Sequence, residues 1–348
     1  NVSVVRIPHG VTGHIIQWNY PAKMMGRTLA PALAMGNAAV VKPSEDACLS
    51  ALKLAELAME AGLPAGALNI VTGYGAEAGA ALTSHPDVNF VTFTGSPEAG
   101  VLVQQAAARN HVPCVLELGG KSPQIVFDDA DLQKAVPVIV KAISQNAGQT
   151  CSAGSRLLVQ QGIYDEFVYT VAERFAALRV GAPTMDLDCG PLISRKQQQR
   201  VRAFIDAAQT QGIPVLAQGS LAPGLSSDGF FVAPTVFGQV PRDSQLANQE
   251  IFGPVLAAMP FTDEADALRL ANATEYGLVA GIWTENGSRQ SRVAQRVHSG
   301  QVFINCSGAG GGVELPFGGV KKSGYGREKG FLALEEMSTT KTIVQYFD

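Results

Sequence analysis

Cysteine is scarce in this 348-residue sequence, which contains only five, an odd number without any Cys-x-x-Cys spacing. A disulfide framework or a structural zinc site needs cysteines in closer pairs, so the pattern favours free thiols in a reducing compartment, the cytoplasm. The five histidines form no His-x-His or His-x-x-x-His pattern. A metal site is therefore not expected.

Charged residues are also few, at 16% of the chain, and no run of basic residues is longer than two. Because the net charge is −4, we expect no nucleic acid as a partner. No apolar stretch reaches the roughly 18 residues of a membrane-spanning helix, so no membrane association is expected. The sequence shows no signal peptide and no initiator Met, and we expect that a preceding part was removed or is not included.

The remaining composition, 46% hydrophobic, predicts a large core in two domains or one large one. Strand-like and helix-like segments alternate along the chain. Strands are expected at 38–42, 67–71, 89–93, 112–118, 124–127 and 155–159, and helices at 44–62, 76–82, 97–108, 132–145 and 164–178. This alternation predicts an α/β fold with parallel sheets covered by helices on both faces, in two units that meet near residue 119.

Two motifs contain the groups for covalent chemistry on a carbonyl carbon. Asn146-Ala-Gly-Gln-Thr-Cys151 offers a thiol after a glycine loop, and Glu117-Leu-Gly-Gly-Lys121 offers a carboxylate beside tight-turn residues. Aldehyde oxidation through a thioester needs such a nucleophile and such a base. A single cysteine is more often a small buried hydrophobic residue, so this motif does not decide the function by itself.

Further motifs follow the ends of expected strands. Gly95 and Ser96 open a helix whose backbone amides could bind phosphate, although the sequence is not Gly-x-Gly-x-x-Gly and an ordinary turn remains open. Lys42 and Glu45 could bind ribose hydroxyls, or could be a solvated helix start. Asn19 could donate to an oxyanion from its proline-ended loop, or could be a turn residue.

Two loops nearer the C-terminus complete the set. Glu250-Ile-Phe-Gly-Pro254 places an acid and an aromatic residue in a turn, and Pro316-Phe-Gly-Gly-Val-Lys-Lys-Ser-Gly-Tyr-Gly-Arg327 is rich in glycine. Taken in order with the motifs above, these segments resemble the aldehyde dehydrogenase superfamily from residue 1 to residue 348. The resemblance implies a Rossmann-like cofactor domain, a second α/β catalytic domain and a small β arm for oligomerisation.

The resemblance also implies a role for each matching residue. Cys151 would be the nucleophile, Glu117 the general base, and Asn19 an oxyanion donor together with the backbone N–H of Cys151. The expected NAD contacts are Ile16, Trp18, Lys42, Glu45, Gly95, Ser96, Leu118, Glu250 and Phe252. The expected lining of the substrate channel comprises Phe317, Thr150 and Ser152, with further walls from the loop 307–314.

The implied domain plan divides the chain into five parts. They are an oligomerisation strand (1–8), part of an NAD-binding domain (9–119), a catalytic domain (120–318), a return segment (319–337) and a second oligomerisation strand (338–348).

Two features depart from the family pattern. Gln17 stands where proline is usual, and family members have a long segment before the residues that match Asn1, so we expect an N-terminal part of the family fold to be absent.

The implied reaction oxidises an aldehyde to its carboxylic acid with NAD, or less favourably NADP, in a homodimer or homotetramer. Two other functions remain open. A CoA-acylating semialdehyde dehydrogenase or acyl-phosphate reductase often lacks the Glu of this motif, whereas Glu117 is present. An inactive or structural protein of the same fold would not need to retain Cys151, Asn19 and Glu117. The identity of the aldehyde does not follow from the sequence.

Overall fold

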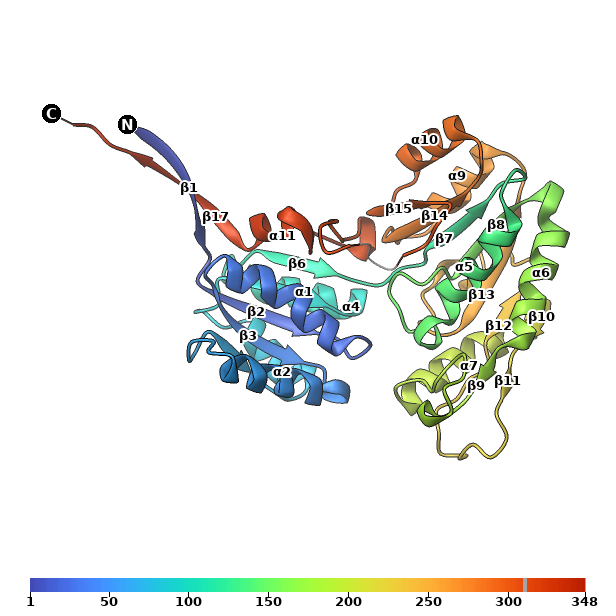
Figure 1. The fold of residues 1–348 in the computed structure, drawn as a ribbon, viewed down its shortest axis with the longest axis horizontal. Coiled ribbons are helices and arrows are strands. Elements are labelled where there is room, and N and C mark those ends of the chain that lie inside the picture. The colour runs from blue at the N-terminus through green and yellow to red at the C-terminus, as the bar shows by residue number, and fades with distance from the viewer. Residues whose placement is uncertain (309–311, 348) are drawn as a thin grey trace. The chain divides into compact units, whose positions relative to one another are not determined.

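The computed structural model describes residues 1–308 and 312–347, and the chain divides into two compact units (Figure 1). Unit 1 comprises Asn1–Leu118 with the described parts of 310–319 and 323–348, and unit 2 comprises the described parts of 119–309 with 320–322. Strands and helices alternate in both, which confirms the α/β class. In the described ranges, no helix has the length and apolar character needed to cross a membrane.

Unit 1 is built on a six-stranded sheet in which five strands are parallel and the edge strand β16 is antiparallel to β6. In spatial order the strands are β16 (Gly324–Tyr325), β6 (Cys114–Glu117), β5 (Phe90–Thr94), β2 (Val11–Ile16), β3 (Ala38–Pro43) and β4 (Leu68–Ile70). Parallel strands need crossover connections, and here helices supply them. This arrangement is the Rossmann-like sheet that the sequence predicted.

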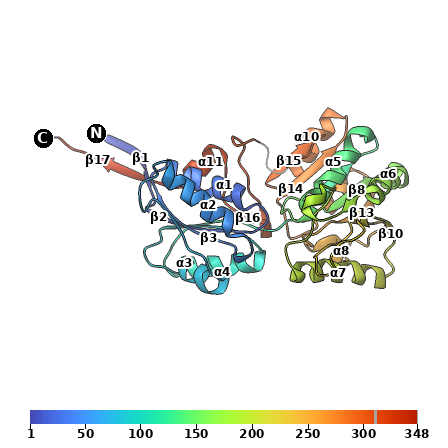
Figure 2. The ribbon, with the colours of Figure 1, turned by 60° about the horizontal axis from the view of Figure 1, so that its bottom comes forward.

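Helices cover both faces of this sheet because successive strand residues point to opposite sides. Ile15 packs with α4 (Pro97–Ala108), while the next residue, Ile16, packs with α1 (Pro21–Ala34) and α2 (Leu49–Glu60). Figure 2 shows α4 and α3 (Ala80–Thr83) on the opposite side of the β2–β3 layer from α1 and α2. The remaining helical segments of unit 1 are α11 (Gly330–Glu336), the 3₁₀ turn η1 (Glu45–Ala47) and the π-turn η2 (Gly75–Gly79).

Two predicted helices of unit 1 differ from the structure. Ser44 does not begin a long helix, because its hydroxyl accepts from the nearby Asp46 N–H and so caps only the short turn η1. The α-helix proper begins at Leu49. The predicted helix 76–82 starts as the π-turn η2 and becomes α-helical only at Ala80.

A two-stranded antiparallel ribbon extends away from the sheet of unit 1 (Figure 1). It pairs β1 (Val2–Pro8) with β17 (Ser338–Val344), so that the two ends of the chain lie side by side. Val2 lies opposite Val344 on the same face of the ribbon as Val4, and all three side chains are more than half exposed. The ribbon therefore presents an apolar face that unit 1 itself does not cover.

Unit 2 contains a seven-stranded sheet that is parallel except for the edge strand β10. In spatial order the strands are β10 (Val215–Gln218), β12 (Thr235–Phe237), β13 (Val255–Phe261), β8 (Arg156–Gln160), β7 (Pro123–Val126), β14 (Val279–Trp283) and β15 (Gln301–Ile304). A small parallel pair is formed by β9 (Arg179–Val180) and β11 (Ser220–Leu221).

Two hydrophobic cores lie on the two faces of this sheet. Leu157 and Val159 of β8 point to one core, with α5 (Leu132–Ser144) and α6 (Tyr164–Ala177), whereas Leu158 points to the other. The second core receives residues of α7 (Arg195–Thr210), α8 (Gln245–Asn248), α9 (Glu264–Asn272) and α10 (Gly287–Arg296). Short 3₁₀ turns complete the chain: η3 (Gln145–Gly148), η4 (Gln161–Ile163), η5 (Pro183–Met185) and η6 (Lys321–Ser323).

Candidate active site

In unit 1, the candidate residues gather at one edge of the sheet. Ile16, Pro43, Thr94 and Glu117 are the last residues of β2, β3, β5 and β6, which are parallel neighbours. The carboxyl ends of parallel strands meet at the same edge, where α/β proteins bind their ligands. The motifs at 16–19, 42–45, 94–96 and 117–118 are therefore brought together by the topology of the sheet.

Lys42 and Glu45 form an ion pair at the end of β3, with 2.9 Å between Nζ and Oε2. Lys42 is buried, whereas the Glu45 side chain is 42% exposed. Partial burial by itself raises the pKa of Glu45, but the hydrogen bond and the positive charge of Lys42 lower it overall. Glu45 is thus a carboxylate whose free edge faces solvent at neutral pH.

Gly95 and Ser96 form a tight turn between β5 and α4. The Gly95 N–H donates to the Glu117 carbonyl over 3.1 Å, and the Ser96 hydroxyl accepts from the Ala99 N–H as the N-cap of α4. A Cβ atom on Gly95 would lie 2.4 Å from the ring of Phe93, so a larger residue there would have to displace that ring. The turn leaves the backbone of the helix start open to a ligand of negative charge.

Asn19 follows β2 and precedes α1, which has Pro21 at its first position. The Asn19 side chain is buried, Trp18 is half buried, and Ile16 belongs to the core. Proline is favoured at the first position of a helix because it has no N–H to satisfy. Pro21 therefore fixes the start of α1 and, through it, the loop that carries Asn19.

A buried polar cluster behind this loop was not expected from the sequence. His14 of β2 contacts the hydroxyls of Thr28 and Thr92 through Nδ1, at 2.6 and 2.9 Å, and that of Thr12 through Nε2, at 2.8 Å. Burial lowers the pKa of His14 to about 3, so its imidazole is neutral. The cluster joins β2, β5 and α1, and so ties the helix that follows Asn19 to the sheet.

Glu117 ends β6 as a buried carboxyl group. Among the described residues, neither of its carboxyl oxygens has a hydrogen-bond partner. Burial raises the pKa of Glu117 well above its usual range, and the negative charge of Glu328 raises it further, while Arg27 and Arg327 oppose the rise. A carboxylate in such surroundings binds a proton readily, which is the property of a general base.

The neighbours of Glu117 include two residues that sequence reasoning missed. Arg27 of α1 and Glu328 form a buried ion pair, and the Arg27 guanidinium lies 4.6 Å from the ring centre of Phe317. Phe317, expected in the substrate channel, is buried and exchanges backbone hydrogen bonds with Glu328. No local pattern marks Arg27, because its partner is three hundred residues away in the sequence.

The glycines of the 316–327 loop allow it to approach β6 closely. A Cβ atom on Gly318 would lie 2.9 Å from Oε1 of Glu117. Gly324 has a φ of +108°, and a Cβ atom there would collide with the Leu116 carbonyl. The Leu118 N–H donates to the Ser323 carbonyl over 3.0 Å. The loop is thus part of the surroundings of Glu117, which its composition alone did not reveal.

In unit 2, Cys151 lies in a constrained loop after α5. Asn146, Ala147 and Gly148 all have positive φ angles, of 52°, 53° and 73°. The left-handed conformation costs roughly 1–2 kcal/mol for each residue with a Cβ atom, so the turn must be held by its surroundings. Gln149 holds it: its Nε2 donates to the Asn146 carbonyl, and its Oε1 accepts from the Ile193 N–H over 2.9 Å.

The Cys151 loop packs on two other motifs within unit 2. The Gly120 N–H donates to Oε1 of Glu250 over 2.9 Å, and a Cβ atom on Gly120 would lie 2.5 Å from the Cys151 carbonyl. A Cβ atom on Gly148 would collide with Gly253. These segments precede the neighbouring strands β7, β8 and β13, so the amino ends of parallel strands bring them together. Phe252 is half buried with a φ of +58°.

Two buried cations support this arrangement. Arg156 donates to the carbonyls of Lys121, Leu270 and Ala271, each over 2.8 Å. Burial and the nearby charge of Arg156 lower the pKa of Lys121 to about 7, although Glu250 acts in the opposite direction. Sequence reasoning placed Lys121 in a motif but assigned it no role.

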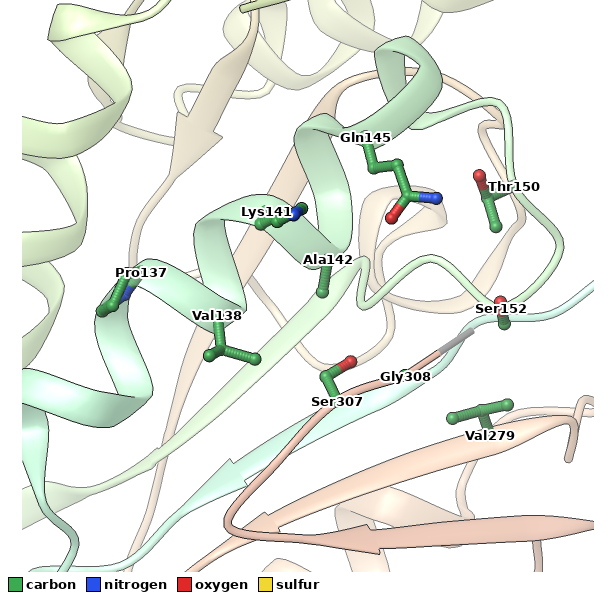
Figure 3. Close-up of a pocket in the computed structure, with 10 residues that line it drawn as sticks. All are labelled: Pro137, Val138, Lys141, Ala142, Gln145, Thr150, Ser152, Val279, Ser307 and Gly308. Carbon is green, nitrogen blue, oxygen red and sulfur yellow. The ribbon is translucent and has the colours of Figure 1, made fainter. Parts of the chain in front are cut away.

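A cavity of about 430 Å³ lies beside the Cys151 loop within unit 2 (Figure 3). Thr150 and Ser152, the two neighbours of Cys151 in the chain, line it. Their role in a substrate channel stays a prediction. Cys151 itself is half buried. From the expected loop 307–314, Ser307 and Gly308 contribute to the lining, whereas residues 309–311 lie outside the described ranges.

The chain is similar to known proteins along nearly its whole length. The sequence profile of the aldehyde dehydrogenase family matches residues 1–343. A hydroxyisobutyraldehyde dehydrogenase of Mycolicibacterium austroafricanum is 45% identical over 337 residues, which cover 97% of this chain and 66% of that protein. The chain thus spans about two thirds of the length of such relatives.

Solved structures show the same likeness. A structure from Burkholderia cenocepacia, solved as that of a presumed aldehyde dehydrogenase, has a TM-score of 0.97 and 62% identity, and covers 98% of this chain and 72% of that one. A betaine aldehyde dehydrogenase of Staphylococcus aureus, solved with NAD⁺, has a TM-score of 0.94 and 36% identity, covering 98% and 68%.

Proposed function

Because this chain belongs to the aldehyde dehydrogenase family, we propose that it oxidises an aldehyde to the carboxylic acid through a thioester on Cys151. The observation that carries the proposal is the Cys151 loop: three left-handed residues hold the thiol at a turn whose flanking side chains line a cavity. A structural cysteine does not need this strained backbone. Related proteins named as aldehyde dehydrogenases support the same conclusion.

We propose NAD as the cofactor, and the residues of unit 1 suit it. The open start of α4 at Gly95 and Ser96 would take the pyrophosphate, and Glu45 with Lys42 would contact the adenine ribose. Ile16, Trp18 and Leu118 would line the same strand edge. In unit 2, Glu250 and Phe252 would contact the nicotinamide half. When bound, NAD supplies the acceptor for the hydride that leaves the substrate. A related structure containing NAD⁺ supports this choice.

The first half of the reaction belongs to Cys151 and Asn19. The Cys151 thiolate adds to the carbonyl carbon of the aldehyde, and the former carbonyl oxygen becomes negatively charged. The Asn19 amide and the backbone N–H of Cys151 donate hydrogen bonds to this oxygen, and such a donor contributes about 3 kcal/mol in comparable sites. Loss of the hydride restores the C=O bond and leaves the acyl group attached to Cys151 as a thioester.

Glu117 carries the second half. Its carboxylate takes a proton from water, the water oxygen attacks the thioester carbon, and the Cys151 thiolate leaves. The raised pKa of Glu117 suits this step because the group must accept a proton near neutral pH. A panel of aldehydes assayed for NADH formation tests the whole proposal. Absence of NADH with every aldehyde tried, from protein that binds NAD, would contradict it.

We predict a preference for NAD over NADP that depends on Glu45. A 2′-phosphate near the Glu45 carboxylate would suffer repulsion of about 1–4 kcal/mol at a partly screened site. Glu45→Ser removes this charge and leaves buried Lys42 to pair with the phosphate. Steady-state kinetics with both cofactors should therefore show the ratio of kcat/KM for NAD to that for NADP falling roughly tenfold or more.

A matched control exists on α2. Lys53 and Glu56 form a second pair with the same spacing, at 2.8 Å, but both are exposed and lie away from the strand ends. Glu56→Ser should leave the cofactor ratio unchanged. A wild-type protein that uses NADP more efficiently than NAD, or an equal response to both substitutions, would remove Glu45 as a selectivity residue.

We further propose that the chain forms a homodimer or homotetramer through the β1–β17 ribbon. Isolated two-stranded ribbons are marginally stable in water, and this one exposes Val2, Val4 and Val344 on one face. Sedimentation analysis should show an oligomer at micromolar concentration. Val4→Lys should weaken the assembly, whereas Ser3→Lys, on the other face, should affect it less. Monomeric wild-type protein with full activity would contradict the proposal.

A cytoplasmic location remains a prediction from the cysteine pattern.

A further inference from the structure

The lining of the cavity beside Cys151 has a distinct charge and polarity. On one side it is lined by Val138 and Lys141 of α5 and by Gln145 at the start of η3, and further lining comes from Thr150, Ser152 and Ser307 (Figure 3). Among the described residues of this lining, Lys141 is the only ionisable side chain, and none is acidic or aromatic. The lining therefore combines one cation with several hydrogen-bond donors.

Lys141 is available to a ligand. Across residues 1–308 and 312–347 the structure shows no ion pair for its ammonium group, and the side chain is exposed on the cavity side of α5. Lys134, two helical turns earlier on α5, differs in this respect because it pairs with Asp131 at 3.0 Å. A negatively charged group of a substrate could thus pair with Lys141 without displacing a carboxylate of the described residues.

We propose that this cavity receives short aliphatic aldehydes that carry a carboxylate at the end remote from the carbonyl, and that Lys141 binds this carboxylate. The inference rests on the proposed function, since it places the carbonyl of the same substrate at Cys151. Val138 and Val279 offer apolar contact for the methylene groups between the two ends. The polar part of the lining around the substrate is completed by the hydroxyls of Thr150 and Ser307 and by the Gln145 amide.

The position of Lys141 favours a short substrate. Lys141 lies in the last turn of α5, and Lys141 and Thr150, the residue before Cys151, line the same cavity. We expect an aldehyde with a few carbon atoms between carbonyl and carboxylate to reach from one to the other. Bulky aromatic aldehydes lack an aromatic stacking partner in the described lining.

Two aldehydes of nearly equal shape separate charge from size. In 4-oxobutanoate the chain ends in a carboxylate, and in 4-methylpentanal two methyl groups replace the carboxylate oxygens. We expect the wild-type protein to favour 4-oxobutanoate in kcat/KM. Lys141→Gln should lower kcat/KM for 4-oxobutanoate about tenfold, mainly through KM, and change it less than twofold for 4-methylpentanal. Added salt should reduce the wild-type preference.

Lys134→Gln is the matched control, because it removes the same charge from the same helix outside the cavity. It should leave the kinetics of both aldehydes unchanged. The proposal is overturned if Lys141→Gln and Lys134→Gln act alike, if Lys141→Gln affects both aldehydes equally, or if the wild-type protein prefers the neutral aldehyde.

A measurement without NAD distinguishes failure of this proposal from failure of the proposed function. Each aldehyde should slow the alkylation of Cys151 by iodoacetamide, because addition of the thiol to the aldehyde carbon makes the sulfur unavailable to the reagent. Mass spectrometry of the Cys151 peptide measures the extent of alkylation. The half-protecting concentration of 4-oxobutanoate should rise about tenfold in Lys141→Gln. Charge-dependent protection without NADH formation would support the pocket and refute the oxidation, and equal protection in both proteins would refute the pocket.

Discussion

Replacement of Cys151 by alanine is expected to abolish NADH formation, by a factor of about 10⁴ or more, while the affinity for NAD changes little. The methyl group cannot add to a carbonyl carbon, so no thioester forms. Alanine also suits a half-buried position in this loop, whose strained turn lies upstream at Asn146 and Ala147. Steady-state assays with an aldehyde panel and calorimetric titration of NAD measure the two quantities separately.

Cys306→Ala supplies the control for this result. Cys306 is the exposed thiol of the chain, and it is the obvious competitor for the role of nucleophile. The Cys306 variant should retain most of its activity. Inactivation by Cys306→Ala, or turnover by the Cys151 variant, would show that the nucleophile has been assigned to the wrong residue.

Replacement of Glu117 by glutamine should separate the two halves of the reaction. The amide cannot take a proton from water, so each Cys151 should form one thioester and release one NADH before turnover stalls. Rapid mixing should show a burst of about one NADH per site, followed by a steady state reduced roughly 10²- to 10⁴-fold. Loss of the burst as well would mean that Glu117 acts earlier, at the thiol.

The pH dependence gives a second measure of the same residue. Burial, reinforced by Glu328, raises the pKa of Glu117. As a base it acts in its deprotonated form, so the wild-type steady-state rate should rise as pH passes upward through this raised pKa and fall below it. Glu117→Gln should lose this limb of the profile, whereas Glu60→Gln, an exposed residue of α2, should keep it.

Local signals in the sequence predicted much of unit 1. Ser96 followed by Pro97 predicted the start of α4, and the structure confirms it with the hydroxyl cap and a helix over Pro97–Ala108. The alternation of strands and helices predicted parallel sheets, and the order of the motifs indicated the aldehyde dehydrogenase family. Both predictions are confirmed. These features depend on residues close together in the chain, so they are visible in its pattern.

Other features had no local signal. Leu49, Leu52 and Leu57 give α2 an apolar composition, yet all three are exposed, because burial depends on what packs against a helix. Likewise, the motif at Glu117 suggested a base, but nothing near Glu117 in the sequence indicated its raised pKa. Its pKa is raised first by burial, to which segments distant in the chain contribute, and then by the negative charge of Glu328.

The sequence by itself therefore determined the α/β class, the family and the identity of the candidate nucleophile and base. Periodicity, caps and motif order are properties of neighbouring residues and need no folded chain to be recognised. The tertiary structure alone decided the electrostatic surroundings of Glu117, the left-handed turn before Cys151 and the place of Lys141 in the cavity. The pKa of Glu117, the strain of the turn before Cys151 and the access of a ligand to Lys141 each depend on groups from different segments of the chain. Only folding brings these groups within a few ångströms of one another.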